Sequence, residues 1–273
     1  ASIQLFHVMM RRQRFHSAYE LAGELRAQQP HDDDQIAKAY AAACFAVGQT
    51  DEAGVLYEKL QQVHPTDHQI PISQGHIYNA SGDRASAIDA FKASAAIKPD
   101  HGDAYWSLAN TKSYKFDDDQ ILQMKNLEQD ATIGSVDRIQ ICFALGKALE
   151  DKGQFDAAFE FYARGNALKL PTTHFNAKQL SKRIEAQIEV CTKALFEQVG
   201  DVGVAAKDPI FIVGLPRAGS TLLEQILASH SQVDGTMELH NVLDLAKRLR
   251  GRDEAGQEDP RYPKILSELD TSL

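Results

Sequence analysis

Prolines recur at a fixed interval in the first two-thirds of the chain. Pro65 and Pro99 are 34 residues apart, and Pro30 precedes Pro65 by 35 residues. This interval is typical of a small supersecondary unit, which can bury its apolar face only by stacking on its neighbours. The spacing therefore predicts an array of packed helix pairs over this part of the chain.

A small residue followed four positions later by an aromatic residue precedes several of these prolines. The pairs are Ala53 with Tyr57, Ala87 with Phe91, and Ala158 with Tyr162, the last of which lies before Pro171. The small side chain lets two helices approach closely, and the aromatic ring fills the space beside it. The period and the pattern resemble the tetratricopeptide repeat. The resemblance implies units at residues 34–67, 68–101, 102–138 and 139–171, after a partial unit.

The unit at 102–138 departs from this pattern in its second half. Around Phe116 the small–aromatic spacing is lost, and the extra length predicts a distorted loop. The two acidic runs, Asp32–Asp34 and Asp117–Asp119, are more typical of helix capping and a solvated loop than of a cation site. The concave face of such an array either holds a peptide or partner protein or only supports the neighbouring domain, and the sequence leaves both open.

Composition and charge exclude several classes of protein. The 273 residues are 43% hydrophobic and 25% charged with a net charge of -9, which fits a soluble chain of about two domains and disfavours a nucleic-acid partner. No apolar run has the length of a membrane span, and the N-terminal residues lack the core of a signal peptide, so we expect a cytoplasmic location. Cys44, Cys142 and Cys191 lie far apart in apolar helical contexts, which predicts small buried thiols and no metal site.

Residues 209–227 are the most informative segment for function. Residues 210–213 form an apolar, β-prone run, Gly214 and Gly219 bracket a loop, and Ser220 opens a stretch with apolar residues at helical spacing. We therefore expect a strand, a glycine-containing loop and the start of a helix. Such a turn presents backbone N–H groups and a helix dipole to an anion, and Arg217 with the hydroxyls of Ser220 and Thr221 adds further donors.

This loop differs from the nucleotide-binding P-loop at one position. Gly214 and Gly219 have the G-x-x-x-x-G spacing, but Ser220 stands where the lysine is required. A nucleotide kinase or NTPase with an atypical loop is therefore disfavoured. The plainer alternative is a strand-to-helix turn whose glycines only satisfy backbone geometry, but such a turn has no need of Arg217 and the hydroxyls.

Glu238 is the acidic residue that spacing brings near this loop. It follows Arg217 by 21 residues, and a loop and a helix of about three turns return the chain towards its starting point. Glu238 would then remove a proton from an incoming hydroxyl, or it would cap a helix or pair with Lys247 or Arg248. On spacing alone, the two roles of Glu238 are equally supported.

Two stretches of this chain resemble the phosphosulfate-binding loop and the following acidic segment of sulfotransferases. They are PIFIVGLPRAGSTLLEQIL and HSQVDGTMEL. The nearest pattern is the Pro-Arg-Ser-Gly-Thr-Thr loop of tyrosylprotein sulfotransferases. Pro216, Arg217, Gly219 and Thr221 match it, whereas Ala218 and Ser220 are small substitutions. Helical repeats followed by this loop are similar to bacterial tetratricopeptide-repeat sulfotransferases, so the resemblance covers most of the chain.

The resemblance implies a reaction and assigns residues to it. The donor would be 3′-phosphoadenosine 5′-phosphosulfate (PAPS), with Glu238 as catalytic base, Arg217 as a catalytic and binding residue, and no metal. The residues implied to bind the phosphosulfate are Arg217, Ala218, Gly219, Ser220 and Thr221. A repeat adaptor with an inert loop and an atypical P-loop kinase remain the rival interpretations. The acceptor and the oligomeric state are not readable from the sequence.

The fold class expected is mainly α. A tetratricopeptide α-solenoid at residues 1–171 is followed by a connector at 172–208, with an amphipathic helix from 176 to 199, and by the first part of a P-loop-like α/β sulfotransferase domain at 209–273. The 3′-phosphate of PAPS usually binds to later elements, and no later segment has the pattern of a partner for the strand at 210–213. We therefore expect the third part to be truncated and this chain to be inactive alone; transfer as efficient as that of a longer form would contradict this.

Overall fold

The computed structural model describes residues 2–28, 34–173, 176–199, 206–236 and 261–268, together with the single positions 242, 245 and 249. The chain divides into two compact units, Ala1–His174 and Phe175–Leu273. The regular structure of the described residues is helical throughout. Within the same residues, no helix combines the length and the apolar character needed to cross a membrane.

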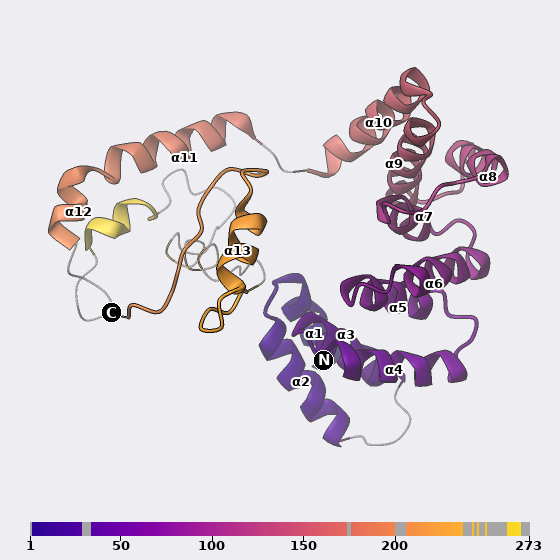
Figure 1. Ribbon diagram of the computed structural model, residues 1–273, viewed down its shortest axis with the longest axis horizontal. Coiled ribbons are helices and arrows are strands. Elements are labelled where there is room, and N and C mark those ends of the chain that lie inside the picture. The colour runs from indigo at the N-terminus through magenta and orange to yellow at the C-terminus, as the bar shows by residue number, and fades with distance from the viewer. Residues whose placement is uncertain are drawn as a thin grey trace. The chain divides into compact units, whose positions relative to one another are not determined.

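The first unit is a stack of helices in which chain neighbours pack together (Figure 1). Its helices are α1 (Ser2–Arg11), α2 (Phe15–Gln28), α3 (Asp34–Ala46), α4 (Thr50–Val63), α5 (Gln69–Ala80), α6 (Arg84–Ile97), α7 (Gly102–Asn110), α8 (Asp118–Gln129), α9 (Ser135–Asp151) and α10 (Phe155–Lys169), followed by the short 3-10 turn η1 (Leu170–Thr172). Each helix from α1 to α6 packs on the next, α7 and α8 both pack on α9, and α9 packs on α10. This order is that of an α-solenoid, as the proline spacing predicts.

Close approach of paired helices explains the small–aromatic pattern. The alanines of the pattern are almost completely buried: Ala53, Ala87 and Ala158. Glycines allow an even closer approach, since a Cβ at Gly75 would lie 2.3 Å from the ring of Phe91, and one at Gly146 would lie 2.5 Å from the ring of Tyr162. Real side chains do not approach so closely, so each ring occupies space that only glycine leaves.

The unit at 102–138 is distorted, as its sequence predicts. Helix α8 begins only at Asp118, where Asp117 caps it in a capping box with Gln120, so this acidic run serves helix capping. In the loop before α8, Phe116 is buried and Tyr114 packs edge-on against it, with 4.9 Å between the ring centroids. The loop thus supplies core residues of its own, and α8 packs on α9 of the following unit.

The apolar core of the first unit runs along the stack in three clusters. One is built from α1 to α3, the second from α3 to α5, and the largest from α5 to α10. Because each cluster draws side chains from neighbouring helix pairs, no pair buries its apolar face alone.

The second unit contains α11 (Ala177–Val190), α12 (Lys193–Val199), α13 (Ser220–Ala228) and the 3-10 turn η2 (Lys264–Glu268) in its described part. The single helix expected from 176 to 199 is two helices, because the backbone leaves helical geometry at Cys191 and the Thr192 hydroxyl accepts a hydrogen bond from the amide of Leu195. Turn η2 packs on α11, where the Gln187 side chain donates to the Tyr262 hydroxyl at 3.4 Å.

The strand expected at residues 210–213 is not formed. Residues 206–215 have no regular structure, and Ile210, Phe211 and Val213 are exposed. A strand requires a neighbour that takes up its backbone hydrogen bonds, and the described residues provide no second strand. The apolar run therefore satisfies the residue preferences of a strand without forming one.

Candidate functional site

The loop between Gly214 and Gly219 closes on itself immediately before α13. The amide of Ala218 donates to the carbonyl of Leu215 at 3.1 Å, which places Pro216 and Arg217 at the two corners of a tight turn. A Cβ at Gly214 would lie 3.4 Å from the Cβ of Ala218, so the chain passes close to its own start. Proline suits the first corner because its ring fixes φ near the value that such turns need.

Arg217 occupies the second corner in a conformation that arginine rarely adopts. Its φ is 69°, in the left-handed region, and Gly219 has a φ of 88°. Glycine adopts this region freely, whereas a residue with a Cβ is strained by about 1–2 kcal/mol. The Arg217 side chain is exposed and makes no hydrogen bond or ion pair with the described residues. An arginine kept in a strained conformation without a partner among the described residues suggests a role outside the fold.

Helix α13 begins beside this turn with an open N-terminus. Gly219 is the N-cap, and among the described residues no side chain accepts a hydrogen bond from the first turn of the helix. Ser220 and Thr221 are exposed at its start. The free N–H groups of a first helical turn carry partial positive charge and are suited to an anion.

After α13 the chain turns back along the same helix. A Cβ at Gly235 would lie 3.1 Å from Oε1 of Glu224 and 3.2 Å from the Cβ of Ala228, so the returning segment lies against α13. The described contacts of the returning segment reach Glu224, one turn after the start of α13, and the return to the loop itself stays a prediction. Glu238 lies outside the described residues, as do Lys247 and Arg248, and its role stays a prediction.

Two features of this region were missed by sequence reasoning. A positive φ at Arg217 runs against the preference of the residue, and only the Leu-Pro-Arg-Ala order of a tight turn could have suggested it. The packing role of Gly235 could have been inferred from a glycine that follows a turn and has to pass a helix closely.

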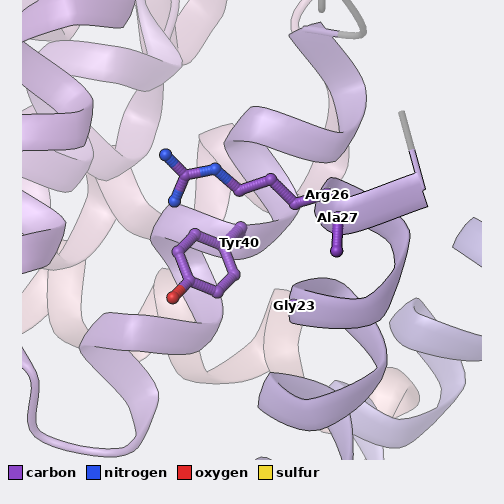
Figure 2. A pocket seen from close by; sticks show the side chains of 4 residues that line it. All are labelled: Gly23, Arg26, Ala27 and Tyr40. Carbon is purple, nitrogen blue, oxygen red and sulfur yellow. The ribbon is translucent and has the colours of Figure 1, made fainter. Parts of the chain in front are cut away.

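A separate hollow of about 400 Å³ lies between α2 and α3 (Figure 2). It is lined by Gly23, Arg26, Ala27 and Tyr40. The Arg26 guanidinium lies 4.7 Å from the centre of the Tyr40 ring, and the Tyr40 hydroxyl donates to Glu52 at 3.1 Å. The hydrogen bond with Tyr19, burial and the bond to Glu52 raise the pKa of Tyr40. Because Arg26 also faces Glu52 at 4.0 Å, the charges here compensate one another, and we assign the cluster to packing between helix pairs.

Three segments of the chain match known protein families. Residues 209–270 match the sulfotransferase family, and residues 72–101 and 139–169 match the tetratricopeptide repeat. The loop and α13 lie within the segment that matches the sulfotransferase family.

A relative and two solved structures are similar to this chain. An "Uncharacterized protein" of Aquifex aeolicus (strain VF5) is 28% identical over 223 residues, which is 81% of this chain and 29% of that relative. The chain therefore spans less than a third of that relative's length. A putative kinesin light chain of Podosopora anserina with nearly identical TPR-like repeats is 18% identical with a TM-score of 0.47, covering 64% of this chain and 96% of that one. MamA (41-end) of Desulfovibrio magneticus RS-1 is 17% identical with a TM-score of 0.43, covering 63% and 97%.

Proposed function

We propose that this chain is part of a PAPS-dependent sulfotransferase and that the loop from Gly214 to Gly219, with the start of α13, holds the phosphosulfate end of the donor. One observation carries the proposal. The family match at 209–270 coincides with a helix N-terminus without a side-chain cap, which directly follows an Arg217 that is strained and has no partner among the described residues. A turn that served only to connect two segments would need neither the arginine nor the open helix end.

The proposed binding roles follow from the chemistry of these groups. The N–H groups of Gly219, Ser220 and Thr221 would donate to the non-bridging oxygens of the phosphosulfate, and the two hydroxyls would add donors. Arg217 would stabilise the negative charge that develops on the bridging oxygen while its bond to sulfur breaks. Ala218 and Gly219 are small, which lets the ligand approach the backbone.

Glu238 is the proposed base for the acceptor. It would take the proton of the attacking hydroxyl as the new sulfur–oxygen bond forms, and adenosine 3′,5′-bisphosphate would leave. The scheme requires no metal, because the guanidinium and the helix terminus supply the positive charge. The acceptor is proposed only as a hydroxyl compound.

The repeat array has a second proposed role, which is to bind a protein or peptide. The repeat matches and the α-solenoid support this role, since stacked helix pairs form extended binding surfaces. The array would present the acceptor or an accessory partner to the sulfotransferase segment. If the loop were inert, this role alone would remain, and the protein would be an adaptor.

Calorimetry with adenosine 3′,5′-bisphosphate and with ATP tests the proposed donor. We expect saturable binding of the bisphosphate and binding of ATP that is at least about tenfold weaker, because the loop lacks the lysine that holds nucleotide triphosphates. Preference for ATP would favour the atypical kinase. Binding of neither nucleotide by a full-length form, together with binding of a peptide by the array, would favour the adaptor.

Replacement of Glu238 tests the proposed base. In the form of the protein that transfers sulfate, we expect Glu238→Gln to leave the dissociation constant of adenosine 3′,5′-bisphosphate unchanged and to slow transfer by roughly a hundredfold or more. Transfer at the wild-type rate would return Glu238 to a structural role.

A further inference from the structure

Two aromatic rings and two polar side chains meet where α7 packs on α9. Trp106 of α7 and Phe143 of α9 have ring centroids 5.6 Å apart with planes tilted by 54°. One turn earlier on each helix, the Gln140 amide donates to Oδ1 of Asp103 at 3.5 Å. Residues three apart share a helix face, so the ring pair and the polar pair lie side by side on the same face. We name Asp103, Trp106, Gln140 and Phe143 the α7–α9 ring site.

The carboxylate of Asp103 is ionised, and the hydrogen bonds that it accepts leave part of its capacity for other donors. The interaction with His76, whose ring nitrogen lies 4.0 Å from the carboxylate, lowers the pKa of Asp103 most, although burial opposes it. Its contacts are nevertheless long, since Ser107 and Gln140 donate at 3.5 Å and His76 stands 4.0 Å away. A third of the Asp103 side chain is exposed. The carboxylate therefore has both the charge and the access to accept a stronger donor.

The rings are held in place and partly exposed. Phe143 packs on α10 where Gly165 leaves room for it, because a Cβ there would lie 3.3 Å from the Phe143 ring. Both Trp106 and Phe143 are half-buried, which leaves part of each ring open to a partner. The exposed faces of aromatic rings attract a cation.

Two basic groups of the described array lie close to this site along or across the helices, and each has an acidic partner. Lys147, one turn beyond Phe143 on α9, is paired with Asp151, which also binds Lys115 at 2.6 Å. His76 approaches the carboxylate from α5, on the preceding helix pair. A cation from another molecule can therefore provide the charge that complements Asp103, and the net charge of -9 favours its approach.

We propose that the α7–α9 ring site binds an arginine side chain of a peptide or protein partner. The guanidinium stacks on the rings of Trp106 and Phe143 and donates to the carboxylate of Asp103. Arginine fits better than lysine because its planar group can stack and donate along two parallel N–H bonds at once. The inference concerns the array alone and does not depend on the sulfotransferase activity.

Fluorescence provides a direct test because Trp106 is the single tryptophan of the chain. The probes are acetyl-Gly-Arg-Gly-amide, the same peptide with citrulline, which is a neutral isostere of arginine, and the same peptide with glutamate. We expect a saturable change of Trp106 emission with the arginine peptide, and at least about tenfold weaker binding of the citrulline and glutamate peptides. Equal responses to the three peptides, or none to the arginine peptide, would overturn the proposal.

A pair of matched variants tests whether the carboxylate of Asp103 binds the arginine peptide. Asp103→Asn is expected to weaken binding of the arginine peptide about tenfold, whereas Asp89→Asn, the same change at an exposed position of α6, should have no effect. Equal affinity in wild type and Asp103→Asn would contradict the assignment. Circular dichroism verifies that both variants are folded, and if Asp103→Asn is not, the citrulline comparison in the wild-type protein decides by itself. No donor nucleotide enters these measurements, so their failure leaves the proposed sulfotransferase function untouched.

Discussion

At the scale of single residues, Arg217 strains the backbone of the loop and has a proposed role in binding an anion. Its positive φ is strained for any side chain other than glycine, and no described residue pairs with its guanidinium. If this position served only the structure, a residue that adopts a positive φ without strain, such as glycine, would suit it better. The arginine therefore separates two accounts of the loop, one in which it binds an anion and one in which it merely turns the chain.

A series of substitutions at Arg217 distinguishes these accounts. Arg217→Ala should lower the affinity for adenosine 3′,5′-bisphosphate by about 1.5–3 kcal/mol, the scale of a charged hydrogen bond, and Arg217→Lys should lose less because the charge is kept. Arg217→Gly should lose as much affinity as alanine, yet slow the hydrogen exchange of the Ala218 amide, because glycine relieves the strain of the turn that this amide closes. Calorimetry and exchange measured by NMR test both effects. An unchanged dissociation constant in the alanine variant would remove Arg217 from the site.

The cysteines allow a second prediction at this scale. Burial raises the pKa of Cys142 to about 11 and also raises that of Cys44, whereas Cys191 is only half-buried, between α11 and α12. Because the thiolate is the reactive form, we expect a thiol reagent at pH 8 to modify Cys191 at least about a hundredfold faster than the other two. Cys191→Ser should abolish the fast phase, and denaturant should make all the thiols react. A fast phase that survives in Cys191→Ser would contradict the described burial of Cys44 and Cys142.

At the scale of helices, two glycines that look alike in sequence have opposite roles. A Cβ at Gly75 in α5 would lie 2.3 Å from the ring of Phe91, whereas a Cβ at Gly54 in α4 would meet nothing within 4 Å. Gly75→Ala should therefore destabilise the array by about 1–3 kcal/mol through overpacking. Gly54→Ala, the matched control, should stabilise it by roughly 0.5–1 kcal/mol because alanine favours the helix. Urea unfolding measures both, and equal effects of the two substitutions would contradict the packing described here.

Helical elements were predictable where local patterns and packing agree. The spacing of prolines, alanines and aromatic rings predicts the helix pairs because the same residues make the contacts between them. The irregular chain at 210–213 was predicted wrongly as a strand, since pairing depends on a partner that residue preference does not reveal. The loop and the start of α13 followed from Gly214, Gly219 and Ser220, but the left-handed backbone of Arg217 opposes the preference of its residue type.

At the scale of the whole repeat array, one buried histidine predicts a pH dependence. His101 lies between α6 and α7, where its ring packs against that of His68 at 4.6 Å between centroids, and its Nδ1 lies 3.3 Å from the Ser94 hydroxyl. Burial, followed by the charge of His68, lowers the pKa of His101 below its usual 6.5. The unfolded chain therefore takes up the proton first as the pH falls, and folding free energy is lost from about pH 6.5 downwards.

Urea unfolding at pH 7.5 and pH 5.5 measures this loss. We expect the wild-type array to be less stable at pH 5.5, and His101→Gln to reduce the difference between the two pH values. His16→Gln, which removes an exposed histidine from α2, is the matched control and should leave the difference unchanged. Carboxylates such as Asp103, whose pKa is lowered, lose their contribution only below about pH 4 and do not obscure the comparison. A difference that is the same in wild type and His101→Gln would contradict the assignment.

The central claim is that the first turn of α13 binds the phosphosulfate end of an activated nucleotide. The most direct measurement is an NMR titration of the backbone amides with adenosine 3′,5′-bisphosphate, repeated with ATP and in Arg217→Ala. The account predicts saturable shifts at Gly219, Ser220 and Thr221 with the bisphosphate, much smaller shifts with ATP, and weakened binding in Arg217→Ala. Absence of shifts at these three amides at saturating bisphosphate, or equal shifts in wild type and Arg217→Ala at every concentration, would contradict it.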